Sequence, residues 1–202
     1  MATADPAVDE RAPGPGLADE DGRVVEDSVT DSELFTTIFD RYFEQVHSYL
    51  VRRVGPDIAD DLAAETFFVA FRQRARFDRS VGVVRAWLFG IAANLLRRHR
   101  RTETRRWQAL ARLPPPEFAG ELEERVAARL SAQASRRRLA AALAALNPRD
   151  REAFLMVAFG ELTYDEVAKA LGIAHGTVCS RLARARRRIR ESLDHTDPRS
   201  LQ

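Results

Sequence analysis

The C-terminal part of the chain carries a dense run of arginines beside small polar residues. The segment GIAHGTVCSRLARARRR covers residues 172–188, and the run RARRRIR continues to residue 190. Guanidinium groups bind phosphate oxygens, and each neutralised phosphate releases counterions, so this composition favours binding to a nucleic-acid backbone. In a helix-turn-helix, the N-terminal half of the second helix contacts base edges while the rest lies near phosphates. The pattern therefore predicts a DNA-binding unit.

Local signals predict the two helices that would hold this surface. Thr163 and Glu166 have the spacing of a capping box, which starts a short helix over 164–171. Gly172 supplies the turn, where a positive φ is needed, and a last helix covers about 175–193. Apolar residues at helical spacing would form the interior: Val167, Ala168, Leu171, Ile173, Val178, Leu182 and Ile189. The alternative is an ordinary helical hairpin with a solvated basic face, and the agreement of these separate signals favours the helix-turn-helix.

Charge is distributed unevenly along the 202 residues. Residues 1–33 hold ten acids against Arg11 and Arg23, a local charge of −8, whereas the remainder holds 30 basic and 20 acidic residues, or +10. This asymmetry predicts a basic body that binds a polyanion. It also suggests that the acidic N-terminal tail could shield the basic faces of its own chain.

Composition excludes several classes of protein. The single cysteine excludes an internal disulfide, and no Cys/His spacing predicts a zinc site. No apolar run approaches the ~18 residues of a membrane span. The N-terminus is acidic and rich in Pro, Gly and Ala, unlike a secretory signal. We therefore expect a cytoplasmic protein with no membrane insertion, no metal and no cofactor.

Periodicity and helix breakers divide the chain into two helical parts. The expected fold is all-α, with two small helical domains joined by a flexible linker. The tail is expected to be disordered because it is acidic and aperiodic, and the linker contains the spacer PPPEFAG. The predicted segments are the tail (1–30), the first domain (31–102), the linker (103–128), the helix-turn-helix domain (129–195) and a short tail (196–202).

Within the first domain we expect three helices. Gly55-Pro56 ends the first, Asp57 is the expected cap of the second, and the loop RFDRSVG leads into the third from about Val84. In the C-terminal domain, Asn147-Pro148 is expected to start a helix that Gly160 closes. Trp87 has two interpretations, base stacking or core packing, and its helical spacing with neighbouring apolar residues favours the core.

Two long motifs resemble a known family. DIADDLAAETFFVAFRQRARFD (57–78) followed by VRAWLFGIAANLLRRHRR (84–101) resembles region 2 of bacterial sigma factors. LNPRDREAFLMVAFGELTYDEVAKALGIAHGTVCSRLARARRRIRESL (146–193) resembles region 4. With only these two regions and a short linker, the chain is similar to the extracytoplasmic-function (ECF) group of the sigma-70 family. The resemblance covers roughly residues 34–193.

The resemblance implies a subunit that binds core RNA polymerase, directs it to promoters and helps to melt them. Region 2 would dock its second helix on the clamp of the largest polymerase subunit, and region 4 would contact the flap region. The positions that fit the clamp contact are Asp60, Asp61, Glu65, Thr66 and Phe68. The acids among them could meet a basic partner, and the alternative is simple helix capping and solvation.

The resemblance also implies that the first domain holds the minus-10 element. Its non-template strand would be bound as a flipped base in a pocket beside a cationic groove. The residues implied are Phe77, Asp78, Arg79, Ser80, Asn94, Arg97, Arg98 and Arg101, with Arg100 beside them. The family often carries an acid three residues after the asparagine, where this chain has Arg97. That departure leaves the detailed minus-10 preference open.

The last helix would read the minus-35 element in the major groove. The residues implied are Tyr164, His175, Thr177, Cys179, Ser180, Arg181, Ala183, Arg184 and Arg187. The family often has Lys or Arg where this chain has Cys179, and a bulkier side chain at Ala183. Base readout should therefore depend on Ser180 and Arg184. For Cys179 a redox switch and a small neutral residue are both open, and the second is favoured.

The resemblance implies one further partner, and two other functions stay open. Family members are commonly held inactive by an anti-sigma factor. A stand-alone helix-turn-helix regulator would explain residues 130–193 but leaves the acidic helix and WLFGIAANLLRRHRR without a purpose. An enzyme is disfavoured because the four histidines are scattered and no glycine-rich phosphate loop occurs. In this interpretation the chemistry belongs to the polymerase.

Overall fold

The computed structural model describes residues 15–80, 82–112 and 123–194. Within these ranges the chain forms helices and turns and no strand, which confirms the all-α prediction. The short 3-10 helices are η2 (Ser32–Leu34), η3 (Arg74–Arg76) and η4 (Arg97–His99). The α-helices are α1 (Pro15–Asp27), α2 (Phe35–Val54), α3 (Pro56–Gln73), α4 (Val84–Leu96), α5 (Arg100–Arg112), α6 (Glu123–Ala145), α7 (Pro148–Ala158), α8 (Tyr164–Leu171) and α9 (His175–Asp194).

Local chemistry explains most helix boundaries. Gly55, at φ 94°, ends α2 and is itself the N-cap of α3, and Pro56 begins α3. Asp57 therefore lies inside the first turn of α3, where its negative charge interacts favourably with the helix dipole. The prediction that Asp57 is the N-cap is wrong, because the N-cap is Gly55, two positions earlier. Asn147 caps α7 as predicted, because its side chain accepts a hydrogen bond from the Arg149 amide at 2.9 Å.

Part of the predicted disordered tail is folded. Pro15–Asp27 form α1, and Val25 is fully buried against the neighbouring helices, so the prediction of disorder is wrong for this segment. The acidic composition concealed the helix because Arg41, which lies in another helix, neutralises Asp21, and Asp21 is only 1% exposed. Residues 1–14 and the short tail 196–202 lie outside the described residues.

The predicted linker is also partly helical. Helix α5 continues to Arg112 and α6 begins at Glu123, so both ends of the expected linker belong to helices. Trp107 of α5 is buried and its ring lies 6.3 Å from that of Phe159, which gives this arginine-rich helix an apolar anchor. The PPPEFAG spacer (114–120) lies outside the described residues.

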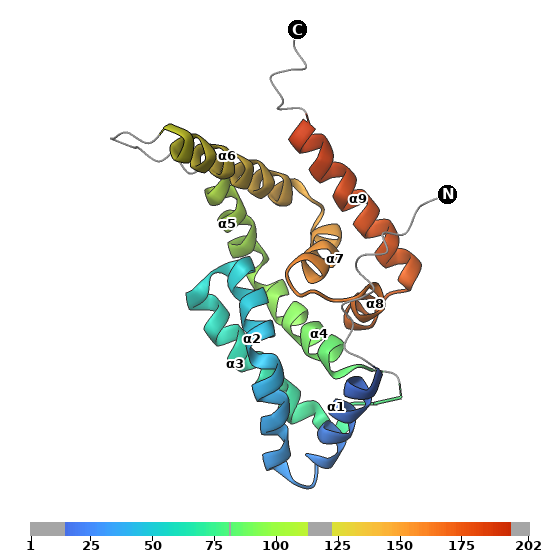
Figure 1. The fold of residues 1–202 in the computed structure, drawn as a ribbon. Helices are drawn as coiled ribbons and strands as arrows, with labels where there is room; N and C mark the ends of the chain where they lie inside the picture. Colours follow the sequence, from blue (N-terminus) through green and yellow to red (C-terminus); the bar gives the residue numbers. More distant parts are fainter. Residues whose placement is uncertain (1–14, 81, 113–122, 195–202) are drawn as a thin grey trace.

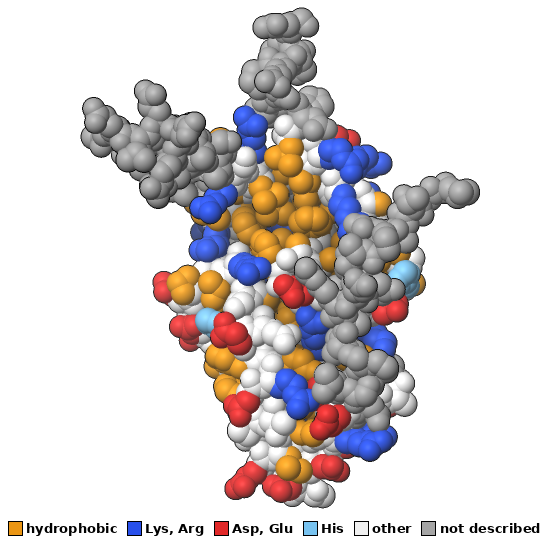
Figure 2. All heavy atoms as spheres, viewed as in Figure 1, with side chains coloured by type: hydrophobic (Ala, Val, Ile, Leu, Met, Phe, Trp, Pro, Cys, Tyr) orange, Lys and Arg blue, Asp and Glu red, His pale blue; other side chains and the backbone are white. Residues whose placement is uncertain are grey.

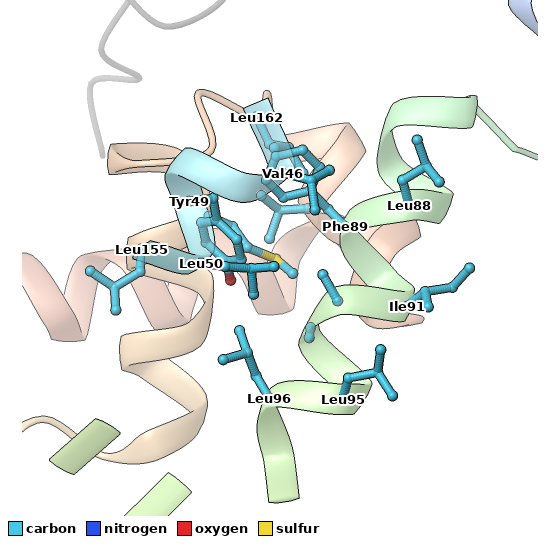
Figure 3. Packing of buried hydrophobic residues seen from close by; sticks show 14 of the residues in the cluster. Val46, Tyr49, Leu50, Leu88, Phe89, Ile91, Leu95, Leu96, Leu155 and Leu162 are labelled. Atoms are coloured by element: carbon cyan, nitrogen blue, oxygen red, sulfur yellow. The ribbon is translucent and has the colours of Figure 1, made fainter. Parts of the chain in front are cut away.

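Helix α4 lies at the centre of the structure and is buried on nearly every side. We call α1–α4 the first unit and α7–α9 the C-terminal unit. Helices α2 and α3 pack on α4 from the first unit, and α8 packs on it from the C-terminal unit (Figure 1). Figure 3 shows side chains from both units in one cluster, with Tyr49 of α2 and Phe89 of α4 near Leu155 and Leu162. The two units therefore share one apolar core.

Glycine permits the close approach of α4 and α8. A Cβ atom at Gly90 would lie 2.8 Å from the backbone oxygen of Ala170, a distance that real Cβ contacts do not reach. Because the obstacle is backbone and not a flexible side chain, a larger residue here would push the two helices apart.

A buried ion cluster joins the two units. Arg53 of α2 donates from Nε to Glu103 of α5 at 2.8 Å and from Nη2 to Glu152 of α7 at 3.2 Å. The Tyr49 hydroxyl accepts a hydrogen bond from Arg53 and donates one to Glu152 at 3.1 Å. Burial raises the pKa of Tyr49 well above its ordinary value, so the hydroxyl keeps its proton. Burial by itself lowers the pKa of Arg53, but the tyrosine and the two carboxylates raise it, so the guanidinium stays charged.

Replacing Arg53 should therefore destabilise the fold. The substitution Arg53→Met leaves the buried carboxylate of Glu103 without its main partner, and the free energy of unfolding should fall by about 3–5 kcal/mol. Arg52→Met is the matched control, because Arg52 is exposed and contributes a cation–π contact with Phe159 worth about 1 kcal/mol or less. Urea unfolding followed by circular dichroism measures both. Equal losses in the two variants would contradict the importance of the buried cluster.

Candidate nucleic-acid interface

Helices α8 and α9 form the predicted helix-turn-helix. The Thr163 amide donates to Glu166 Oε2 at 2.8 Å, and the Glu166 amide donates to Thr163 Oγ1 at 3.2 Å, which completes the capping box. Gly172 adopts the left-handed conformation at φ 60° and ends α8. The interior prediction is confirmed for Val167, Val178, Leu182 and Ile189, which are buried, whereas Ala168, Leu171 and Ile173 are half-buried.

The outer face of α9 carries most of the residues predicted to contact DNA. His175, Thr177, Ser180, Ala183, Arg184 and Arg187 are exposed, whereas Cys179 and Arg181 are half-buried. The Ser180 hydroxyl donates to the Gly176 carbonyl at 2.7 Å, within the same helix. The half-buried Tyr164 accepts a hydrogen bond from Arg186 at 2.8 Å, so this phenol is held against α9.

Arg184 is held by a partner that the sequence pattern did not reveal. Its Nε and Nη2 donate to the two carboxylate oxygens of Asp150 at 3.0 and 2.9 Å. This hydrogen bonding and the charge of Asp150 raise the pKa of Arg184 above its ordinary value. A base contact by Arg184 would therefore require exchange of its Asp150 partner, whereas Ser180 keeps its acceptor capacity.

Cys179 belongs to a short series of polar contacts at the start of α9. Its Sγ lies 3.7 Å from Nδ1 of His175, and Nε2 of that histidine lies 3.7 Å from the Asp165 carboxylate. The redox interpretation of Cys179 stays untested.

The loop before α4 lies beside an apolar hollow. The Asp78 carboxylate accepts hydrogen bonds from the amide and the hydroxyl of Ser80, at 2.9 and 2.6 Å, which orders the loop. Phe77 and Trp87 lie with ring centroids 5.0 Å apart, and Trp87 is half-buried. These rings line a cavity of about 470 Å³, and Gly172 and Ile173 of the helix-turn-helix line it too.

The remaining residues predicted for the minus-10 element lie at the other end of α4. Asn94, Arg97, Arg98 and Arg101 are all exposed. Arg97 donates to the Asn94 side-chain oxygen, and Arg98 lies 3.5 Å from Glu65 of α3. The structure thus brings the loop residues together and separates them from this basic end by the length of α4.

Helix α3 presents an acidic and aromatic face. Asp60, Asp61, Glu65 and Phe68 are exposed, Phe68 by 59%, and Asp60 lies 2.7 Å from His47 Nε2. The prediction for Thr66 is wrong, because Thr66 is fully buried and its hydroxyl donates to the Leu62 carbonyl at 2.6 Å.

Phe39 of α2 lies beside this face and was not among the predicted site residues. It is 39% exposed, its ring lies 5.0 Å from that of Phe67, and both line a groove of about 320 Å³ with Phe68. Helical spacing groups apolar residues on one face but does not say how far a partner helix covers that face. The sequence held no signal that separates Phe39 from its buried neighbours.

The two units also meet through Arg85, near the start of α4. Its Nη2 donates to the backbone carbonyls of Gly160 and Glu161 at 2.8 and 3.2 Å, and its Nη1 lies 3.4 Å from Glu166. Glu161 has a φ of 54°, which is uncommon for a residue with a side chain. The first unit therefore holds the turn between α7 and α8 directly.

Apolar and basic side chains lie close together on one face of the molecule (Figure 2). Figure 2 shows apolar side chains gathered on the upper part of the visible face, near α6, α7 and α9, with basic side chains around them. Among the described residues, no group of three or more His, Cys, Asp or Glu side chains could hold a metal ion. No helix in the described ranges has the length and apolar character needed to cross a membrane.

Comparison with protein families matches both units separately. Residues 38–106 match the model for sigma-70 region 2, and residues 136–189 match the model for sigma-70 region 4. The ECF RNA polymerase sigma factor SigK of Mycolicibacterium vanbaalenii is 26% identical, over 81% of this chain and 83% of that relative. The ECF RNA polymerase sigma factor SigL of Mycobacterium tuberculosis is 27% identical, over 85% of this chain and 95% of that relative.

Solved structures share the fold. CnrH, in complex with the cytosolic domain of CnrY, is similar with a TM-score of 0.63 and 21% identity, over 88% of this chain and 99% of that one. The sigma factor RpoE, in complex with the anti-sigma factor NepR from Bartonella quintana, is similar with a TM-score of 0.53 and 24% identity, over 81% and 98% of the two chains.

Two glycines of the helix-turn-helix allow a matched test of the turn. Neither Gly172 nor Gly176 has an atom within 4 Å of an added Cβ, but only Gly172 has a positive φ. Gly172→Ala should lower the free energy of unfolding by about 1 kcal/mol, whereas Gly176→Ala should leave it unchanged or raise it by up to ~1 kcal/mol. Thermal unfolding measures both, and equal effects would refute the role of the turn conformation.

Proposed function

Since the chain belongs to the extracytoplasmic-function group of the sigma-70 family, we propose that it binds core RNA polymerase and directs it to promoters with minus-35 and minus-10 elements, where it promotes DNA melting. The observation that carries the proposal is the presence of two different surfaces in one chain. Helix α9 offers a basic, exposed face for duplex DNA, and α3 offers an acidic and aromatic face for a protein.

Polymerase binding is assigned to the outer face of α3. Phe68 and the neighbouring Phe39 of α2 supply exposed aromatic rings, and the exposed acids Asp60, Asp61 and Glu65 precede Phe68 on α3 by one to two turns. Such a surface suits a partner that combines apolar and basic side chains, and we assign it to the clamp of the largest subunit. Contact of the C-terminal unit with the flap region is supported by the apolar area in Figure 2.

Minus-10 binding is assigned to the loop and the end of α4. The cavity beside Phe77 and Trp87 has aromatic walls on which a flipped base could stack. Asn94, Arg97 and Arg98 provide polar and cationic groups for the backbone of the same strand. In this proposal the chain supplies position and strand separation, and catalysis belongs to the polymerase.

A stand-alone repressor or activator is the second function considered. It would use the helix-turn-helix in the same way, but it gives no purpose to the exposed aromatic rings of Phe39 and Phe68. Large exposed apolar groups on a polar surface indicate a protein partner, and this observation favours the polymerase subunit.

Regulation by an anti-sigma factor is part of the proposal. CnrH is solved with CnrY and RpoE with the anti-sigma factor NepR, and both folds resemble that of this chain. An anti-sigma factor would act by covering the faces of α3 and α9 or by holding the two units together.

Promoter binding requires the two units to separate. The two elements lie about 25 base pairs apart by their names, or roughly 85 Å along B-DNA. Helices α4 and α8 touch each other in this structure, so one rigid arrangement cannot reach both elements. We propose that the arrangement described here is a closed form, which opens when the chain binds polymerase.

Weakening one ion pair between the units should favour the open form. Glu152→Gln removes the charge that pairs with Arg53 across the interface, while Arg53 keeps Glu103. A loss of about 1–2 kcal/mol should raise the open population five- to thirtyfold, because one charged hydrogen bond is worth that much. Hydrogen exchange of the α4 and α8 amides should become faster accordingly. The control is Glu33→Gln, an exposed acid of η2 in the first unit. Equal exchange in both variants would contradict this role of Glu152.

Core binding is tested with Phe68→Ala. Phe68 is mostly exposed, so the variant should fold normally while retention of core RNA polymerase falls at least about tenfold and promoter-dependent run-off transcription falls in parallel. Val29→Ala is the control, because Val29 is a 45% exposed apolar residue outside α3. If the unchanged chain fails to bind core polymerase at modest salt, the proposed function itself is wrong.

A further inference from the structure

Helix α1 lies N-terminal to the residues that match the model for sigma-70 region 2. The match to sigma-70 region 2 begins at residue 38, and α1 ends at Asp27. The helix is anchored by Asp21, whose buried carboxylate accepts hydrogen bonds from Arg41 and Tyr42 of α2. Burial, followed by the hydrogen bond to Asp21, raises the pKa of Tyr42, so the phenol stays a donor. Helix α1 is therefore docked by specific polar contacts and by the buried Val25.

The outer side of α1 lies against the loop that precedes α4. An added Cβ at Gly22 would lie 2.5 Å from Cγ of Arg79 and 2.7 Å from its Cδ, so the arginine stem crosses the helix at this glycine. The Arg79 guanidinium lies 3.8 Å from the Glu26 carboxylate. Just beyond α1, the Ser28 carbonyl accepts a hydrogen bond from Arg74 at 3.0 Å. Helix α1 therefore holds Arg79 of the loop, and the turn after α1 holds Arg74 of η3.

The charge of α1 is of the same sign as that of a nucleic-acid strand. Residues 20–27 (EDGRVVED) contain four acids and one arginine, a net charge of −3. Of these acids, Glu26 lies beside Arg79 of the loop assigned to the minus-10 strand, whereas Asp21 is buried against α2. Carboxylates and phosphates bind guanidinium groups in the same way, so the Glu26 carboxylate competes with a phosphate for Arg79.

We propose that α1 is an intramolecular cover that competes with the minus-10 strand for Arg79 and the adjoining loop. The proposal rests on the proposed function, because it assumes that this loop binds a single DNA strand. The cover is built to be displaced: the Glu26–Arg79 pair is long and part-exposed, so it is weak and screened by salt, whereas the Asp21 anchor is buried. DNA can therefore remove the outer contacts before the anchor opens.

The test compares variants of the full-length chain that differ by one charge. Asp21→Asn removes the anchor, and Asp27→Asn removes an exposed charge from the same helix and is the matched control. Fluorescence anisotropy with a labelled single-stranded DNA oligonucleotide of mixed sequence measures affinity across a salt series. Asp21→Asn should bind the strand roughly threefold or more tightly than the control at low salt. The slope of log K against log salt should steepen by about 0.7, the value expected for one more neutralised phosphate on a single strand.

A second measurement separates release of α1 from general unfolding. Hydrogen exchange should become faster in residues 21–27 of Asp21→Asn while the α3 and α4 amides keep their protection. Glu26→Gln leaves the anchor in place and should tighten strand binding in the same direction by a smaller factor. Released α1 with unchanged affinity and slope would overturn the proposal, and so would equal affinities of Asp21→Asn and Asp27→Asn.

Core polymerase binding distinguishes failure of the cover from failure of the proposed function. Asp21→Asn should bind core polymerase as the unchanged chain does, because the face of α3 carries none of the α1 contacts. If core binding is normal and strand affinity does not change, the cover is wrong and the proposed function stands. If neither the unchanged chain nor any variant binds core polymerase or the strand, the proposed function fails and the cover fails with it.

Discussion

The guanidinium of Arg53 is the interaction on which the rest of the structure depends. It lies in the apolar interior, where an unpaired charge is costly, so the carboxylates of Glu103 and Glu152 must stay within hydrogen-bonding distance. These three residues belong to α2, α5 and α7. Their pairing sets how the first unit, the connecting helices and the helix-turn-helix lie relative to one another. Arg151 lies 3.8 Å from Glu103 and adds a second positive charge to the same cluster.

The polar character of this interface suits a contact that must form and break. Interfaces between domains of one chain are commonly more polar than permanent ones, because their surfaces must also be stable in water. Arg85 follows the same principle: it donates to backbone carbonyls of the α7–α8 turn, which water can satisfy after separation. Burial of the apolar side chains around Phe89 and Leu162 favours return to the closed form. A closed form held in this way can be opened by a partner that binds α3 and α9 more strongly than the units bind each other.

The sequence pattern predicted the helix-turn-helix more accurately than it predicted the sites of the first unit. Helix α8 was predicted to the residue, because capping box, apolar spacing and turn glycine are all local signals. Thr66 was named for the clamp contact and is buried, and Phe39 is exposed without having been predicted as a site residue, since burial depends on the helix that packs opposite. The role of Arg184 changed for the same reason: Asp150 lies 34 positions earlier in the chain, and no local pattern joins the two.

The sequence by itself determined the helical class, most helix boundaries, the two family regions and the basic face of α9. Each of these follows from interactions within a few residues, where spacing and side-chain type are sufficient. Only the tertiary structure decided that α1 is folded, that the two units share a core, and that Tyr49 meets Glu152, 103 positions away. Such contacts depend on how whole helices pack, and a buried charge becomes favourable only when distant parts of the chain bring its partners to it.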